Sequence, residues 1–162
     1  MGFPGNVIRP SNCYGSGQLT YRIIPKALIY GLKNKKFPLE GGGKAKKSFM
    51  HTDDLSEAIL KILKSKKYGE VYNAGIKKPV TMKEIVEEVS RYLDIKFNDF
   101  VINAPGRKTE DKQYWVDSTK INKKLGWKPY ISLRDGISET GNWVIENIDE
   151  LSKEPMTFSL RA

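Results

Sequence analysis

Two glycine clusters come closest, among the residues of this sequence, to the types and spacing of a phosphate-binding loop. A dinucleotide fold binds the pyrophosphate at a glycine-rich turn between a strand and a helix, where the backbone can approach the phosphates. Gly15-Ser16-Gly17 is not followed by the third glycine of such a turn, and Gly41-Gly42-Gly43-Lys44 lacks the first glycine and the Ser/Thr of a P-loop. Both clusters are therefore interpreted as ordinary turns.

Histidine and cysteine, which carry much metal and nucleophilic chemistry, occur once each. Because His51 is the only imidazole, the sequence excludes a Ser-His-Asp arrangement or a multi-histidine metal site within this chain. Cys13 has no partner for an internal disulfide, which agrees with a reducing compartment. We therefore assign no metal ligand within this chain.

Length and composition are typical of one soluble domain. The 162 residues are 39% hydrophobic and 29% charged, which is enough for a hydrophobic core. No stretch approaches the roughly 18 apolar residues that span a bilayer, and the N-terminus has neither a basic region nor the apolar core of a signal peptide. We therefore expect a cytoplasmic protein with no membrane partner.

The net charge of +9 raises the question of a polyanionic partner. Lysine-rich surfaces bind phosphate backbones by counterion release. Here the lysines form short clusters, such as those in Lys33 to Lys36 and Lys64 to Lys67, and no aromatic residues alternate with them as in RNA-binding motifs. Nucleic-acid binding is therefore the less favoured interpretation, and a phosphate-bearing small molecule would use some of the same charge.

Strands and helices are expected to alternate along the chain, which indicates an α/β fold. Thr81 to Glu84 fits a capping box at the start of a helix, and the turn-rich segment from Pro10 to Gly17 is expected to be a loop. The clearest helical periodicity gives one expected buried face, made of Leu55, Ala58, Ile59, Ile62 and Leu63. The expected strands are Asn6 to Arg9, Phe37 to Glu40, Glu70 to Gly75 and Phe100 to Asn103. The expected helices are Ile23 to Lys35, Asp53 to Lys64, the one that follows Thr81, Asp117 to Leu125, and Ser132 to Ile148.

A specific resemblance begins at residues 9–18, which read RPSNCYGSGQ. This stretch is similar to the RPxNxYGPGQ motif of extended short-chain dehydrogenase/reductases that act on nucleotide sugars. Further blocks follow in the order of that family: IIPK (23–26), FPLEGGG (37–43), KSFMHTDD (47–54), GEVYNAG (69–75), PGR (105–107) with Asp111, and DSTKINKKLGWKP (117–129). Together they cover nearly the whole chain, and they most resemble dTDP-glucose 4,6-dehydratase-like enzymes and their epimerase relatives.

The resemblance implies a fold and a division of the chain. The fold is the C-terminal, substrate-binding part of a Rossmann-type α/β enzyme, without its N-terminal dinucleotide-binding half. Residues 1–150 would form a nucleotide-sugar-binding lobe that keeps some strands of the Rossmann sheet, and residues 151–162 would form a C-terminal tail. The strand at Asn6 to Arg9 would then have an unpaired edge and an uncovered apolar face, so we expect the missing half, or self-association, to cover it.

The resemblance also implies which residues bind a nucleotide-diphosphate sugar. Arg107 would bind the diphosphate with its planar fork, or else form a surface salt bridge with Glu110 or Asp111. Lys47 stands where the family usually has arginine, which keeps the charge and loses the bidentate geometry. The other implied substrate residues are Asn12 and Asn73 for the sugar-phosphate region or as loop caps, Ile24, Phe37 and Leu39 as walls for the base or as core, and Pro25 and Lys26 beside them. Pro10 and Ser11 would make a weak contribution to the cofactor site.

No catalytic residue of the family is implied in this chain, and His51 matches a strand position of the family, which implies a structural role. Family members remove a hydride from the sugar with a tyrosine whose pKa is lowered by a lysine four residues later, and both precede the RPxN motif. Tyr92 and Lys96 have this spacing, but they lie at the end of an amphipathic helix far downstream, and we interpret the match as a coincidence. NAD is the family's cofactor, and we expect this chain alone not to bind it.

Three functions therefore stay open on the sequence. The leading one is the substrate-binding portion of an NAD-dependent nucleotide-sugar 4,6-dehydratase or epimerase, catalytically incomplete by itself. The alternative is a non-enzymatic module that binds nucleotide sugars or a partner, and the third is a basic nucleic-acid-binding protein.

Overall fold

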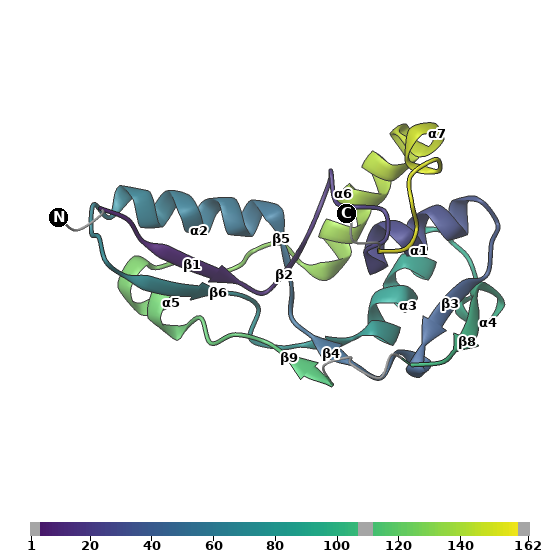
Figure 1. Cartoon of the computed structure of the whole chain (residues 1–162), viewed down its shortest axis with the longest axis horizontal. Coiled ribbons are helices and arrows are strands. Elements are labelled where there is room, and N and C mark those ends of the chain that lie inside the picture. The colour runs from purple at the N-terminus through teal and green to yellow at the C-terminus, as the bar shows by residue number, and fades with distance from the viewer. Residues whose placement is uncertain (1–3, 107–111, 159–162) are drawn as a thin grey trace.

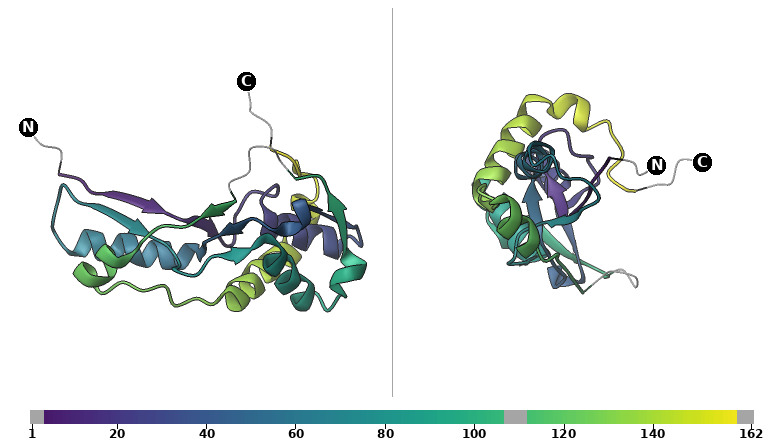
Figure 2. Two further views of the ribbon diagram at one scale, coloured as in Figure 1. Left: turned by 90° about the horizontal axis from the view of Figure 1, so that it is seen from below. Right: turned by 90° about the vertical axis from the view of Figure 1, so that its left-hand side faces the viewer.

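The computed structural model describes residues 4–106 and 112–158, which form an elongated molecule with a hydrophobic core toward each end (Figures 1 and 2). The elements in chain order are β1 (Val7–Pro10), β2 (Asn12–Tyr14), α1 (Ile23–Leu32), β3 (Phe37–Glu40), η1 (Gly41–Gly43), β4 (Lys46–Lys47), β5 (Phe49–His51), α2 (Thr52–Lys64), β6 (Val71–Ala74), β7 (Val80–Thr81), α3 (Met82–Tyr92), α4 (Phe97–Phe100), β8 (Val101–Ala104), β9 (Gln113–Tyr114), α5 (Thr119–Leu125), α6 (Leu133–Glu146) and α7 (Ile148–Leu151). None of the helices in the described residues is long and apolar enough to cross a membrane.

The smaller core lies beside the parallel pair of β1 and β6, whose register joins Ile8 to Tyr72. Because side chains alternate along a strand, Ile8, Tyr72 and Ala74 share one face of the pair. Helices α2 and α5 cover this face (Figure 2). The buried members of the smaller core are Met50, Ala58, Ile62, Tyr72, Ala74, Ile121 and Trp127.

The larger core is built by α1, α3 and α6 together with the parallel pair of β3 and β8. Helix α3 begins with the expected capping box, in which Thr81 Oγ1 accepts from the Glu84 N–H and the Glu84 carboxylate accepts from the Thr81 N–H. Helix α6 packs closely through Gly141, where a Cβ would lie 2.2 Å from the ring of Tyr92. The buried members of the larger core are Tyr14, Ile24, Ala27, Leu28, Ile29, Phe37, Leu39, Phe49, Met82, Ile85, Val86, Val89, Phe100, Ile137 and Val144.

The parallel pair of β2 and β5, hereafter the ribbon, joins the two cores. Its register places Cys13 beside Met50 and Tyr14 beside His51. Tyr14 belongs to the larger core, whereas Met50 is buried in the smaller core and Cys13 packs against it. Since side chains alternate between the two faces of a strand, this short ribbon contributes one face to each core.

A buried carboxylate fastens the connection between α5 and α6 to the start of α2. Asp54 accepts hydrogen bonds from the N–H groups of Tyr130 (2.8 Å) and Ile131 (3.4 Å), and its own carbonyl accepts from Nε1 of Trp127 at 3.0 Å. Burial raises the pKa of Asp54, while the two backbone hydrogen bonds oppose that rise. These hydrogen bonds hold the segment between α5 and α6, which leads into the larger core, against the smaller core.

Most of the expected elements are confirmed. The expected strand at Phe37 to Glu40 coincides with β3, and the expected helix at Asp53 to Lys64 differs from α2 by one residue. The last long helix begins after Ser132, whose hydroxyl accepts from the Asp135 N–H as a cap. The remaining expected strands and helices match β1, β6, β8, α1, α3 and α5 with shifts at their ends.

Three expectations need correction. The segment from Pro10 to Gly17, expected to be a loop, contains β2, because its residues pair with β5. Helix α5 has Ser118 at its cap position, although Asp117 does accept from the Thr119 N–H and its pKa is lowered by that bond and by the Thr119 hydroxyl. Finally, two residues expected in the buried face of α2 are exposed, Ile59 at 39% and Leu63 at 67%.

We predict that Asp54→Ala lowers the free energy of unfolding by about 2–4 kcal/mol, because it leaves two backbone N–H groups without their charged acceptor. Urea unfolding measures the change. Asp53→Ala is the matched control, since its carboxylate is exposed and the neighbouring N–H groups keep their partners. Equal midpoints for the two variants would contradict this role of Asp54.

Candidate functional site

The carboxyl ends of β1 and β6 form the part of the structure where an open α/β sheet places its ligands. Ser11 follows β1, and its N–H donates to the carbonyl of Ala74 at 2.8 Å. Gly75 follows β6, and a Cβ on it would lie 2.9 Å from Cβ of Ser11 and 2.7 Å from Cγ2 of Val116. The two loops therefore approach each other as closely as a glycine allows.

Two serine hydroxyls hold the loop after β6 in place. The Ser48 hydroxyl accepts from the Ile76 N–H at 3.0 Å, donates to the Ile76 carbonyl at 2.8 Å, and lies 3.1 Å from the hydroxyl of Ser11. The Ser118 hydroxyl accepts from the Gly75 N–H and donates to the Gly75 carbonyl, both at 2.8 Å. The backbone at this sheet edge is therefore fixed before any ligand arrives.

Asn12 and Lys47 are brought to the same edge. Nδ2 of Asn12 lies 3.4 Å from the carbonyl of Ser48, the residue that follows Lys47. Lys47 is half-buried on β4, in register with Val80 on one side and Tyr114 on the other. The amide of Asn12 and the backbone next to Lys47 thus lie close together beside the ends of β1 and β6.

Asn73 lies one residue before the end of β6, directly beside Arg9 of β1. It points to the face opposite the buried Tyr72, because neighbouring residues of a strand alternate. Pro10 ends β1, and Ser11 is buried among the hydroxyls described above. The ligand roles implied for Asn73, Pro10 and Ser11 stay predictions.

The residues expected to wall the base are buried in the larger core. Ile24 is fully buried, and the ring of Phe37 lies edge-on to Tyr30 at 5.8 Å and tilted against Phe100 at 5.9 Å. Pro25 and Leu39 are also buried, and Nζ of Lys26 lies 5.8 Å from the ring centre of Tyr30. Contact of these side chains with a base stays a prediction.

Arg107, with Glu110 and Asp111, lies outside the described residues. The chain enters that segment from β8 and leaves it into β9, which pairs with β4 beside Lys47. Gly106, just before it, packs against η1, since a Cβ there would lie 3.3 Å from Cα of Gly41. The diphosphate role of Arg107 stays a prediction.

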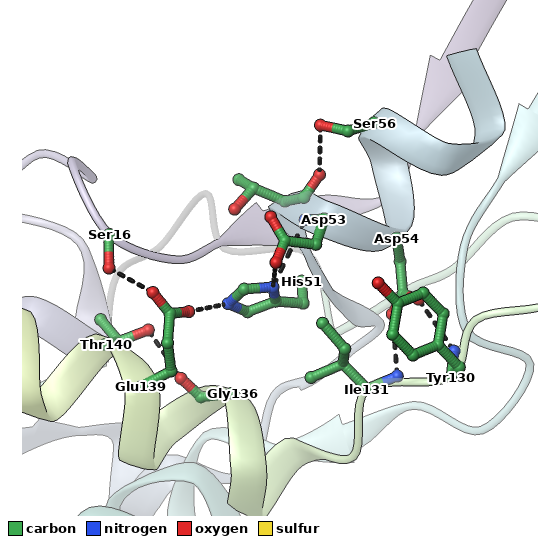
Figure 3. Close-up of polar contacts among 11 residues, drawn as sticks. Ser16, His51, Asp53, Asp54, Ser56, Tyr130, Ile131, Gly136, Glu139 and Thr140 are labelled. Carbon is green, nitrogen blue, oxygen red and sulfur yellow. Dashed lines mark hydrogen bonds and ion pairs between the residues drawn. The ribbon is translucent and has the colours of Figure 1, made fainter. Parts of the chain in front are cut away.

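Sequence reasoning missed a polar group that joins three elements (Figure 3). His51, interpreted as structural, caps α2: its Nδ1 accepts from the Asp53 N–H at 3.3 Å. Its Nε2 lies 2.5 Å from a carboxylate oxygen of Glu139 on α6, and the other oxygen accepts from the Ser16 hydroxyl at 2.5 Å. No local pattern marks Glu139, because its partners are far away in the sequence.

The chain matches known nucleotide-sugar enzymes over most of its length. Residues 2–140 match the family model described as GDP-mannose 4,6 dehydratase. Among curated proteins, human dTDP-D-glucose 4,6-dehydratase is 31% identical over 150 residues, which is 90% of this chain and 43% of the relative.

Solved structures show the same fold. A dTDP-glucose 4,6-dehydratase from Bacillus anthracis, in complex with NAD, gives a TM-score of 0.83 at 29% identity, over 91% of this chain and 47% of the other. The dTDP-glucose 4,6-dehydratase DesIV from Streptomyces venezuelae, with NAD and TYD bound, gives 0.82 at 30% identity, over 89% and 44%. The chain therefore spans less than half the length of these relatives.

We predict that Ser48→Ala lowers the free energy of unfolding by about 1–3 kcal/mol, because the fully buried Ser48 hydroxyl is the acceptor for the partly buried N–H of Ile76. Ser118→Ala should cost less, since Ser118 is only half-buried and water can replace its hydroxyl. The control is Ser56→Ala on the exposed side of α2. Unfolding by urea ranks the three variants, and a Ser48→Ala midpoint equal to that of Ser56→Ala would contradict the prediction.

Proposed function

The chain belongs to the family of NAD-dependent nucleotide-sugar epimerases and dehydratases within the short-chain dehydrogenase/reductases, and we propose that it is the portion of such an enzyme that binds the nucleotide-diphosphate sugar. The observation that carries this proposal is the contact of the Asn12 amide with the carbonyl of Ser48, the residue after Lys47, beside the carboxyl ends of β1 and β6. The name of the DesIV structure, which records TYD and NAD, agrees with a ligand of this class.

The chemistry of this edge suits a diphosphate. Lys47 supplies a positive charge on a strand that is paired on both sides, and Arg107, which precedes β9 in the sequence, would add a bidentate cation. Asn12 offers an amide to the sugar-phosphate oxygens, and the backbone around Gly75 and Ile76 is held in advance by serine hydroxyls. A pre-formed edge of this kind binds without a large ordering cost.

We infer that NAD, which supplies hydride transfer in the family, is not bound by this chain alone. Gly15 is packed against Thr52, and Ser16 beside it is bonded to Glu139, so the first part of that glycine turn is already in contact with protein atoms. The turn at Gly41–Gly43 leads into β4 and not into a helix. Within the described residues neither cluster offers a strand-to-helix cradle for a pyrophosphate, and we derive no step of catalysis through the cofactor.

An apolar surface supports a further part of the proposal, a partner that completes the fold. Within the described residues β1 pairs only with β6, so its other edge is open. Beside it lies a cavity of about 190 Å³ whose lining includes Ile59, Leu63 and Tyr68. These three side chains are 39%, 67% and 63% exposed, and they are hereafter called the α2 surface.

An exposed apolar surface next to an open strand edge is typical of a protein interface. Over half the length of the relatives has no counterpart in this chain. We propose that the α2 surface contacts that remaining half, and that in its absence the chain self-associates there.

The first test is titration of the chain with uridine diphosphate and thymidine diphosphate by calorimetry. We expect saturable binding, weakened about tenfold or more in Lys47→Ala, because a charge-assisted hydrogen bond contributes about 1.5–3 kcal/mol. Lys46→Ala is the matched control, since Lys46 is exposed and alternates to the other face of β4.

A short RNA separates the competing functions in the same assay. Salt-dependent RNA binding without nucleotide binding would overturn the proposal in favour of a nucleic-acid-binding protein. A non-enzymatic module would be favoured by a different result. In that case the chain binds nucleotides but shows no dehydratase or epimerase activity, even when it is joined to the N-terminal half of a relative.

Sedimentation of the chain alone tests the α2 surface. We expect concentration-dependent association that Leu63→Lys reduces strongly, because the charge would lie at the centre of the contact. Leu19→Lys is the control, since Leu19 is exposed to a similar degree, 57% against 67%, but is not part of this surface. A monomeric native chain, or an equal effect of the two variants, would contradict the assignment.

A further inference from the structure

Three residues far apart in the sequence form a polar bridge between the two halves of the molecule (Figure 3). Ser16 lies in the loop after β2, His51 at the start of α2, and Glu139 on α6. Glu139 Oε1 accepts from the Ser16 hydroxyl at 2.5 Å, and Oε2 lies 2.5 Å from Nε2 of His51. We call this group the Glu139 bridge.

The Glu139 carboxylate contacts two different elements of the structure. Nδ1 of His51 accepts from the Asp53 N–H, so a neutral imidazole carries its proton on Nε2, the nitrogen that faces Glu139. The carboxylate of Asp53 lies 3.8 Å from Nδ1, and the Tyr14 ring lies edge-on to the imidazole at 5.4 Å.

The loop that carries Ser16 is confined on both sides. A Cβ on Gly15 would lie 2.3 Å from Oγ1 of Thr52, so the loop touches the first residue of α2. On its other side the Ser16 hydroxyl is bonded to α6 through Glu139. The loop therefore cannot move without breaking contact with one of the two helices.

The same loop is continuous with the nucleotide edge. Asn12 lies four residues before Ser16. The loop is closed by Gln18, whose Nε2 donates to the Cys13 carbonyl at 2.6 Å. His51 ends β5, the strand that follows Ser48. The Glu139 bridge thus contacts the end of β5 at His51 and the loop after β2 at Ser16, on the side of the ribbon opposite to Asn12 and Phe49.

We propose that Glu139 is a positioning residue for the nucleotide site: through Ser16 and His51 it fixes the β2 loop against β5 and so sets the distance between Asn12 and Lys47. This inference rests on the proposed function. Half of the Glu139 side chain is exposed, so its ion pair adds little to stability. Its effect therefore falls on the geometry of the site more than on the folding equilibrium.

The test compares Glu139→Ala and Glu139→Gln with Glu146→Ala, a control on the same helix whose side chain is exposed. The first readout is the nitrogen-15 spectrum of the imidazole, which is unambiguous because the chain has one histidine. We expect a proton on Nε2 in the native chain and in Glu139→Gln, where the amide oxygen still accepts, and a shifted Nε2 signal in Glu139→Ala.

The second readout is the backbone amide spectrum. Glu139→Ala should move the signals of Ser16 and Asn12, and Glu146→Ala should leave both in place. An unmoved Asn12 signal in Glu139→Ala would overturn the positioning role, whether or not a nucleotide binds. A dispersed spectrum shows that each variant is folded.

The third readout is the affinity for uridine diphosphate. Glu139→Ala should weaken binding about fivefold or more, and Glu139→Gln should restore binding close to the native value. If the native chain binds uridine diphosphate and Glu139→Ala binds it equally well, the positioning role of Glu139 is overturned and the proposed function still stands. Absence of binding by the native chain would instead overturn the proposed function, while the Asn12 signal still decides the positioning role.

Discussion

The ribbon of β2 and β5 is the interaction on which both the fold and the candidate site depend. Its two strands have three residues each, yet Tyr14 and Phe49 enter the larger core while Cys13 and Met50 contact the smaller one. A slip of one residue would send every side chain to the wrong core. The same register places Asn12 next to the segment of Lys47, so packing and ligand geometry are set together.

Local signals in the sequence were sufficient for most elements, because helix periodicity, capping boxes and turn residues act over short distances. The capping box at Thr81 and Glu84 and the left-handed glycine that ends α5 are examples. The site residues Asn12 and Lys47 followed from resemblance to a family, and their proximity could not be derived from spacing, since it depends on pairing between distant strands.

Features made by non-local contacts were missed. Strands β2 and β5 are three residues long and lack the alternation of a half-exposed strand, so Pro10 to Gly17 resembled a loop. Glu139 has no local marker, because its partners are Ser16 and His51. The periodicity of α2 correctly predicted an amphipathic helix, but Ile59 and Leu63, which were expected in its buried face, are exposed. Such a pattern identifies apolar side chains that need cover without telling which protein surface covers them.

We propose that the ribbon and β4 create one nucleotide-diphosphate edge within a basic chain that has other lysine clusters. Mapping of amide chemical shifts with uridine diphosphate shows directly where the nucleotide binds. We expect shifts concentrated at Asn12, at Lys47 and Ser48, and at Gly75 and Ile76. Shifts centred on the lysine clusters of residues 33–36 or 64–67, or no saturable shifts at all, would contradict this proposal.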